Sequence, residues 1–246
     1  MYSSKDGINN GYAFIQNLIS KNYKYAGTPV YNVTKDDLSK LATIGEKYGI
    51  PLEWLFNLIK HESASTFNPA ITNSIGATGL IQFMTTINGK KMTYAKANGS
   101  NPVDTSILRK MNFSEQLDYV DGFLKRNLKR YLNAEGKIPD NFTQGDVFMT
   151  IFYPVAVGKP NYQFPDSVSR ANGGIRKPLD YVDKALKNSV FPLNVFPYTL
   201  AEVKEKFGKV VEQTKEKIKK NILPTILIIC AISFAGYMLY KNVKIK

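Results

Sequence analysis

Apolar residues recur at steps of three and four along most of the chain, which is the period of amphipathic helices. The pattern predicts one helix from the capping residue Thr34 to Gly49, and a second that begins at Pro51 and covers residues 51–63. Two further helices are predicted over residues 114–132 and from Thr143 to Tyr153. Runs of alternating strands and internal repeats are missing from the sequence, so the expected fold class is mainly α with at most a minor hairpin. Residues 88–105, rich in Gly, Asn, Lys and Pro, are predicted to form a loop.

A different pattern begins near the end of the chain. Residues 199–221 carry apolar positions at helical steps, and Thr199 with Glu202 fits a capping box, which predicts a basic amphipathic helix. The next 19 residues, 222–240, contain no charge. As a helix rising about 1.5 Å per residue they would be roughly as long as a bilayer's hydrocarbon core is thick. We therefore expect a transmembrane helix followed by a basic tail, 241–246.

Composition narrows the possible chemistry. The chain has 33 Lys and Arg against 20 Asp and Glu, a formal charge of +13, while 43% of its residues are hydrophobic, as in globular proteins. One Cys excludes an intramolecular disulfide framework, and one His with one Cys excludes the usual zinc clusters, so neither a metal nor a cofactor is expected. The charge beside the apolar run suits anionic lipid headgroups. Nucleic-acid binding is the weaker alternative and is not expected, because no recognised motif accompanies the charge.

One carboxylate lies on an apolar helix face. Glu62 follows Leu55, Leu58 and Ile59 by seven, four and three residues, so it projects from that face near the end of its helix. Partial removal from water raises a carboxyl pKa and suits the group to act as a general acid near neutral pH. Taken alone, a Glu at a fraying helix end or one paired with a Lys would explain the same position.

Four short elements stand in order from this carboxylate onward: Glu62-Ser63, Asn68-Pro69, Gly76-Ala77-Thr78-Gly79-Leu80 with Gln82, and Met84. Together they resemble the motifs of the soluble lytic transglycosylase family of lysozyme-like muramidases. The glycines permit tight turns beside a substrate, and Gln82 offers a donor and an acceptor to sugar groups. The resemblance covers residues 50–160. It implies that Glu62 is catalytic and that the substrate contacts are Gln82, Tyr153, Met84, Ser74 and Ser63.

The sequence around Tyr153 and Ser74 departs from the family pattern, and Ser63 has a different expected role. The family's Ala-Tyr-Asn motif has its nearest counterpart in residues 150–160, which makes Tyr153 the tyrosine that hydrogen-bonds near the catalytic Glu, with Pro154 in place of the Asn. Helical spacing with Phe148 and Phe152 leaves a core aromatic as the alternative for Tyr153. The spacing around Ser74 differs from the commonest family form. Ser63 is expected to support the turn after Glu62 rather than to react.

The resemblance implies cleavage of the β-1,4 bond between N-acetylmuramic acid and N-acetylglucosamine in peptidoglycan. Glu62 would protonate the glycosidic oxygen and then take the proton of the muramoyl 6-hydroxyl, which closes a 1,6-anhydro ring. A hydrolytic lysozyme of the same fold would instead recruit a second acid such as Asp104, Asp140 or Asp146. A catalytically idle wall-binding or structural protein is the third possibility. His61 lacks the second His that a HExxH zinc site requires.

The expected organisation is a lysozyme-like transglycosylase domain followed by membrane elements. The segments are an N-terminal extension, 1–33, the transglycosylase domain, 34–198, the amphipathic helix, 199–221, the transmembrane helix, 222–240, and the tail, 241–246. The N-terminus shows no apolar stretch or cleavage site typical of a secretory signal. We expect a membrane-anchored protein of a bacteriophage particle that opens the host wall during infection, with other virion proteins as further partners. The alternative location is a bacterial inner membrane.

Overall fold

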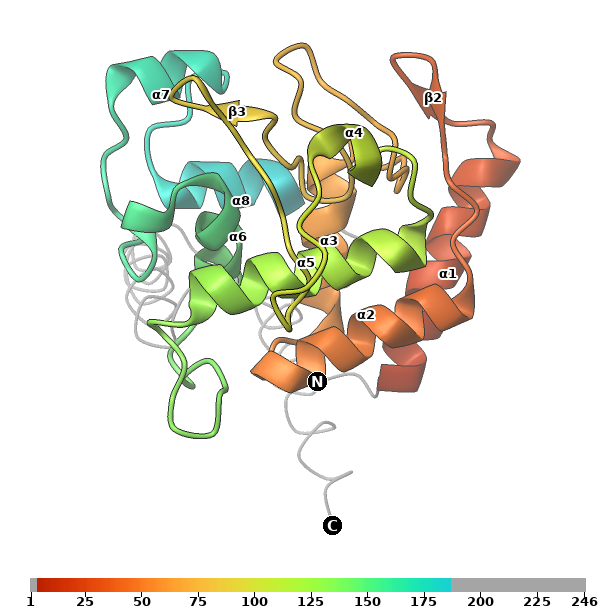
Figure 1. The fold of residues 1–246 in the computed structure, drawn as a ribbon, viewed down its shortest axis with the longest axis horizontal. Helices are drawn as coiled ribbons and strands as arrows, with labels where there is room; N and C mark the ends of the chain where they lie inside the picture. The colour runs from red at the N-terminus through yellow and green to blue at the C-terminus, as the bar shows by residue number, and fades with distance from the viewer. Residues whose placement is uncertain (1–3, 187–246) are drawn as a thin grey trace, which may run out of the picture. The chain divides into compact units, whose positions relative to one another are not determined.

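The computed structural model describes residues 4–186, which form a mainly helical unit with two short antiparallel hairpins (Figure 1). The helices are α1 (Ser4–Ser20), α2 (Lys35–Tyr48), α3 (Leu52–Glu62), α4 (Thr105–Leu108), α5 (Phe113–Leu128), α6 (Gln144–Phe152), the 3-10 helix η1 (Pro154–Ala156), α7 (Asp166–Ala171) and α8 (Pro178–Leu186). The hairpins pair β1 (Lys24–Tyr25) with β2 (Thr28–Pro29) and β3 (Thr86–Ile87) with β4 (Lys90–Lys91). This composition confirms the predicted mainly α class.

The predicted amphipathic helix, transmembrane helix and basic tail lie outside the described residues. Within residues 4–186, each helix is too short or too polar to cross a bilayer.

Local capping fixes the helix ends that the sequence predicts. The Thr34 side chain accepts a hydrogen bond from the Asp37 N–H in a capping box, and Gly49 ends α2 in the left-handed conformation at φ +73°. Pro51 is extended, at ψ 140°, so α3 begins one residue later than predicted. Thr143 caps α6 as expected. The predicted helix over 114–132 is α5, which ends four residues early, at Leu128.

Helix α3 lies at the centre of the packing and contacts α1, α2, α6 and α8 (Figure 1). Its Leu55, Leu58 and Ile59 are at most 1% exposed, and the surrounding helices also direct buried residues into this core. The segment predicted as an N-terminal extension contains α1, whose Ile15 is fully buried in the same core. A Cβ on Gly11 would meet the Phe56 ring at 2.9 Å, so the glycine permits α1 to lie close to α3.

Candidate active site

Glu62 is the last residue of α3, and its Oε1 accepts a hydrogen bond of 2.6 Å from the Tyr181 hydroxyl of α8. The residue is half-buried. Burial raises the pKa of Glu62 to about 7, and the hydrogen bond from Tyr181 acts in the opposite direction. A substantial fraction of this carboxyl group is therefore protonated near neutral pH, as the apolar spacing around Glu62 predicts. Such a group can donate a proton and take one back.

Tyr181 is held rigidly by aromatic neighbours. Its ring stacks on Phe152 at 4.2 Å between centroids, and the His61 ring meets it edge-on at 5.1 Å. Burial, followed by the nearby Glu62 carboxylate, raises the pKa of Tyr181 well above its ordinary value, so the hydroxyl remains a donor. Sequence reasoning missed this residue because the resemblance ended at residue 160. The available signal was the helical spacing of Tyr181 with Pro178 and Ala185 on the buried face of α8.

Tyr153 occupies a different environment. It follows α6 directly, and its ring lies 5.2 Å from Phe164 and 5.8 Å from Tyr162 in an aromatic cluster. Within residues 4–186, the side-chain hydrogen bond to Glu62 comes from Tyr181 alone. The bond that the resemblance gives to Tyr153 is thus made by Tyr181 in this structure.

Ser63 stabilises the turn that follows α3 and Glu62. Its fully buried Oγ donates to the Ile59 carbonyl at 2.6 Å and accepts from the Phe67 N–H at 3.0 Å. The turn contains non-glycine residues at positive φ, namely Ala64, Ser65 and Phe67. Because such conformations are strained, they persist where the surroundings hold them. Ser63 therefore holds the turn beside Glu62, and its buried hydroxyl has no access to solvent.

The other predicted contacts lie on the loop between α3 and β3. Ser74 is exposed, whereas Gln82 and Met84 are half-buried. Gln82 stands at φ +50°, and its Nε2 donates to the Gly79 carbonyl at 3.2 Å. The three side chains therefore retain access to solvent on the loop that carries the glycine motif, where a substrate can reach them.

Gln116 of α5 braces this loop, and sequence reasoning missed it. Its side chain is fully buried, and its Oε1 accepts from the Leu80 N–H at 2.6 Å. Its Nε2 donates to the carbonyls of Pro69 and Leu108 at 3.0 and 2.9 Å. A Cβ on Gly79 would lie 2.3 Å from the Gln116 Oε1, so the motif glycine is required for this approach. The signal in the sequence was a glutamine four residues before Val120 on the apolar face of its helix.

Residues 41–120 match the Transglycosylase SLT domain family. The matched segment contains Glu62, the glycine motif and Gln116, whereas Tyr153 and Tyr181 lie beyond it. No curated protein and no solved structure matches the chain. The match supports an SLT-type, lysozyme-like assignment, with which the mainly helical fold is consistent, and it implies peptidoglycan as the class of substrate.

Two of the acidic residues considered for a hydrolytic mechanism, Asp104 and Asp146, have structural roles. Asp104 lies within the SLT-matched segment, and Asp146 lies beyond it. Asp104 caps α4 and forms an ion pair of 2.5 Å with Lys91, which holds the pKa of Asp104 well below its usual range. Asp146 completes the capping box of α6 with Thr143, and its Oδ1 accepts from the Gly158 N–H at 2.5 Å. Asp140 is exposed.

His61 directly precedes Glu62 in the chain and is half-buried. Burial, followed by the charges of Lys184 and Lys60, lowers the pKa of His61 to about 4, so its imidazole is neutral at physiological pH. Among the described residues, no cluster of three His, Cys, Asp or Glu side chains is arranged to hold a metal ion.

Proposed function

We propose that the chain is a peptidoglycan lytic transglycosylase in which Glu62 acts first as acid and then as base. The observation that carries this proposal is the half-buried Glu62 carboxyl, with a pKa of about 7, at the end of the SLT-matched helix α3. A group that titrates near the working pH can serve in both protonation states during one reaction.

In the proposed reaction, protonated Glu62 donates to the oxygen that joins N-acetylmuramic acid to N-acetylglucosamine. The bond from the anomeric carbon to this oxygen breaks, and the substrate's own acetamido group stabilises the resulting positive charge. The Tyr181 hydroxyl stabilises the Glu62 carboxylate that is left, because a hydrogen bond to the charged form favours it. Glu62 then takes the proton of the muramoyl 6-hydroxyl, whose oxygen closes the 1,6-anhydro ring, and no water is consumed.

The roles of the other acids favour this single-carboxylate mechanism over hydrolysis. A hydrolase of the usual kind needs a second carboxylate as nucleophile or as activator of water. Asp104 and Asp146 accept hydrogen bonds from backbone N–H groups at helix starts, which gives both of them structural roles. A mechanism in which the acetamido group of the substrate stabilises the charge needs no second carboxylate.

Mass spectrometry of the muropeptides released from purified peptidoglycan tests the proposal. The full chain should release products that end in 1,6-anhydromuramic acid, and Glu62→Gln should release none. Reducing-end products would replace the proposal with a hydrolase. Absence of products from a well-folded chain would replace it with a wall-binding or structural protein.

For the location, we propose that residues 222–240 anchor the enzyme in the membrane of a bacteriophage particle, where it opens the host wall during infection. The support is the uncharged run flanked by lysines in a chain that also carries an SLT segment. Co-purification of the chain with lipid-containing phage particles, lost on deletion of 222–240, is the expected result. Recovery in the bacterial inner membrane alone would favour the alternative location.

A further inference from the structure

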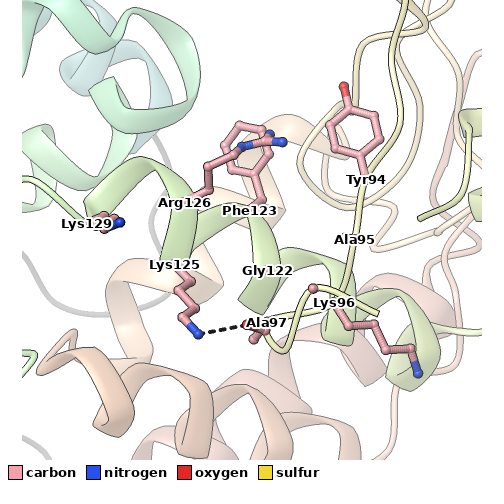
Figure 2. A pocket seen from close by; sticks show the side chains of 10 residues that line it. Tyr94, Ala95, Lys96, Ala97, Gly122, Phe123, Lys125, Arg126 and Lys129 are labelled. Carbon is pink, nitrogen blue, oxygen red and sulfur yellow. Dashed lines mark hydrogen bonds between the residues drawn. The ribbon is translucent and has the colours of Figure 1, made fainter. Parts of the chain in front are cut away.

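A cavity of about 260 Å³ lies between α5 and the loop of residues 94–99 (Figure 2). We refer to it as the α5 pocket. Two aromatic rings and four cationic side chains line it, namely Tyr94, Phe123, Lys96, Lys125, Arg126 and Lys129. This combination of rings and cations is suited to an anionic group carried on a larger molecule.

The α5 pocket is built by a close approach between backbone segments. A Cβ on Gly122 would lie 2.0 Å from the Ala95 carbonyl oxygen, so a glycine is needed where the loop rests on α5. The Lys125 Nζ donates to the Ala97 carbonyl at 2.9 Å, and this bond fastens the loop to the helix (Figure 2). Backbone hydrogen bonds between Tyr94 and Val103 close the loop at its base. The pocket is therefore a defined feature of the fold rather than a gap between mobile side chains.

The cationic side chains at the rim of the α5 pocket are only partly balanced by carboxylates. Lys96 forms an ion pair of 3.0 Å with Asp118, but within residues 4–186 no carboxylate lies within ion-pair distance of Lys125, Arg126 or Lys129. Lys125 and Lys129 are four residues apart on exposed helix surface, where like charges destabilise each other. A bound oxyanion would relieve this repulsion.

Arg126 is oriented by the aromatic rings. The centre of its guanidinium lies 5.3 Å from the Phe123 ring centroid and 5.9 Å from that of Tyr94. Cation–π contacts of this kind limit the conformations of a long side chain, so less entropy is lost when its N–H groups bind an oxyanion. Figure 2 shows the guanidinium beside the Phe123 ring, on the same side of α5 as Tyr94.

The α5 pocket adjoins the loop that carries the predicted glycan contacts. The Tyr94 hydroxyl donates to the Met84 carbonyl at 2.8 Å. Phe83, which follows Gln82, packs at 4.7 Å from Tyr94 and 6.1 Å from Phe123. The wall of the pocket is thus continuous with the segment of Gln82 and Met84.

We propose that the α5 pocket binds a carboxylate or phosphate group attached to the glycan strand, so that the substrate is an acidic wall polymer rather than bare glycan. This inference rests on the proposed function, since it assumes that the glycan lies along the neighbouring loop. Carboxylates of stem peptides and phosphates of wall-linked polymers share the required chemistry.

The test measures binding of the full chain carrying Glu62→Gln, which leaves the wall intact, to purified wall sacculi. Replacing Lys125, Arg126 and Lys129 together by Gln should weaken binding about tenfold, because charge-assisted hydrogen bonds are lost. The matched control replaces Lys21, Lys24 and Arg109 by Gln, which removes the same charge from exposed positions outside the pocket. An equal loss in both triple variants would overturn the proposal in favour of general charge attraction.

Treated sacculi identify the source of the oxyanion. If amidase removal of the stem peptides abolishes the difference between the pocket and control variants, the ligand is a carboxylate of the stem peptide; if acid removal of the phosphate polymers does so, it is a phosphate. Should circular dichroism show that the triple variant is unfolded, Lys129→Glu, at an exposed position, serves instead and should weaken binding in the same way.

Cleavage by the same variants with Glu62 restored separates the two proposals. Pocket-dependent binding without any cleavage would refute the proposed function alone. Cleavage together with equal binding by the pocket and control variants would refute the α5 pocket proposal alone.

Discussion

Glu62 stabilises the folded chain less when it is charged than when it is protonated. Its pKa is about 7 in the folded state and close to 4.3 in an unfolded chain, so between these values the folded state binds more protons. Stability conferred by the protonated form is complete below about pH 4.3 and is lost as the pH rises through 7, by roughly 3–4 kcal/mol in total. An ion-paired carboxylate has the opposite pH dependence, because the stability that it confers is lost as the pH falls.

Glu62→Gln should therefore stabilise the chain at pH 8 by about 3 kcal/mol and have little effect at pH 4. Urea unfolding at the two pH values measures the difference. The control is Glu135→Gln, at an exposed position, which should change stability by less than about 0.5 kcal/mol at both. An equal effect of Glu62→Gln at pH 4 and pH 8 would show that burial does not raise this pKa.

Tyr181→Phe should move the alkaline limb of the cleavage profile to higher pH. The hydrogen bond from Tyr181 lowers the pKa of Glu62, so its removal leaves the acid protonated over a wider range. At the same time kcat should fall, because the carboxylate formed during the reaction loses a donor. The measurement is kcat against pH for the release of anhydro products. Tyr153→Phe is the matched control and should leave the limb in place; the reverse result would assign the role to Tyr153.

The spacing of Leu55, Leu58 and Ile59 sufficed to predict the burial of Glu62, because residues on one helix share a face at fixed intervals. The partner of Glu62 could not be predicted in this way. Tyr181 lies 119 positions away in the chain, and the contact depends on how α8 packs against α3. Side-chain hydrogen bonds between distant elements leave no periodic signal in a sequence.

At the scale of elements, the glycine motif depends on Gln116. Gly79→Ala would place a Cβ at positive φ and 2.3 Å from the Gln116 Oε1. The substitution should therefore lower the free energy of unfolding by about 2–4 kcal/mol. It should also reduce cleavage, because it displaces the loop of Gln82. Gly89→Ala has the same sign of φ with no atom within 4 Å, and it should cost only about 1 kcal/mol. Thermal unfolding of both variants measures the two effects. Equal losses would mean that the approach to Gln116 is unimportant.

Helix ends were predictable where local capping sets them, as at Thr34, Gly49 and Thr143. Helix α1 was not predicted, since two glycines and three asparagines lower the helix propensity of its 17 residues. Its stability comes instead from packing, in which Gly11 brings it close to Phe56 of α3. Tertiary contacts of this kind override local preference and cannot be read from one segment.

For the folded unit as a whole, α1 is part of the core, and α1 and the segment after it contact the turn that follows Glu62. Phe14 packs edge-on at 6.4 Å from Phe67, and the Tyr23 hydroxyl donates to the Ala64 carbonyl at 3.1 Å. Ile15→Ala should therefore cost about 2–4 kcal/mol, as deletions of fully buried side chains do. Asn10→Ala, at an exposed position of the same helix, should change stability by less than about 0.5 kcal/mol. Urea denaturation distinguishes the two, and similar small effects would make α1 a peripheral element.

The edge-on contact between His61 and Tyr181 also gives the chain a natural spectroscopic probe. His61 is the sole histidine, so its imidazole C–H signals can be assigned in a proton NMR spectrum without isotope labels. Because its own pKa is about 4, these signals should stay nearly constant from pH 5 to 8 except for a small displacement centred near pH 7, as Glu62 ionises beside the tyrosine ring. In Glu62→Gln the displacement should vanish. The protonation state of the acid could then be followed during glycan binding through a ring that takes no part in the chemistry.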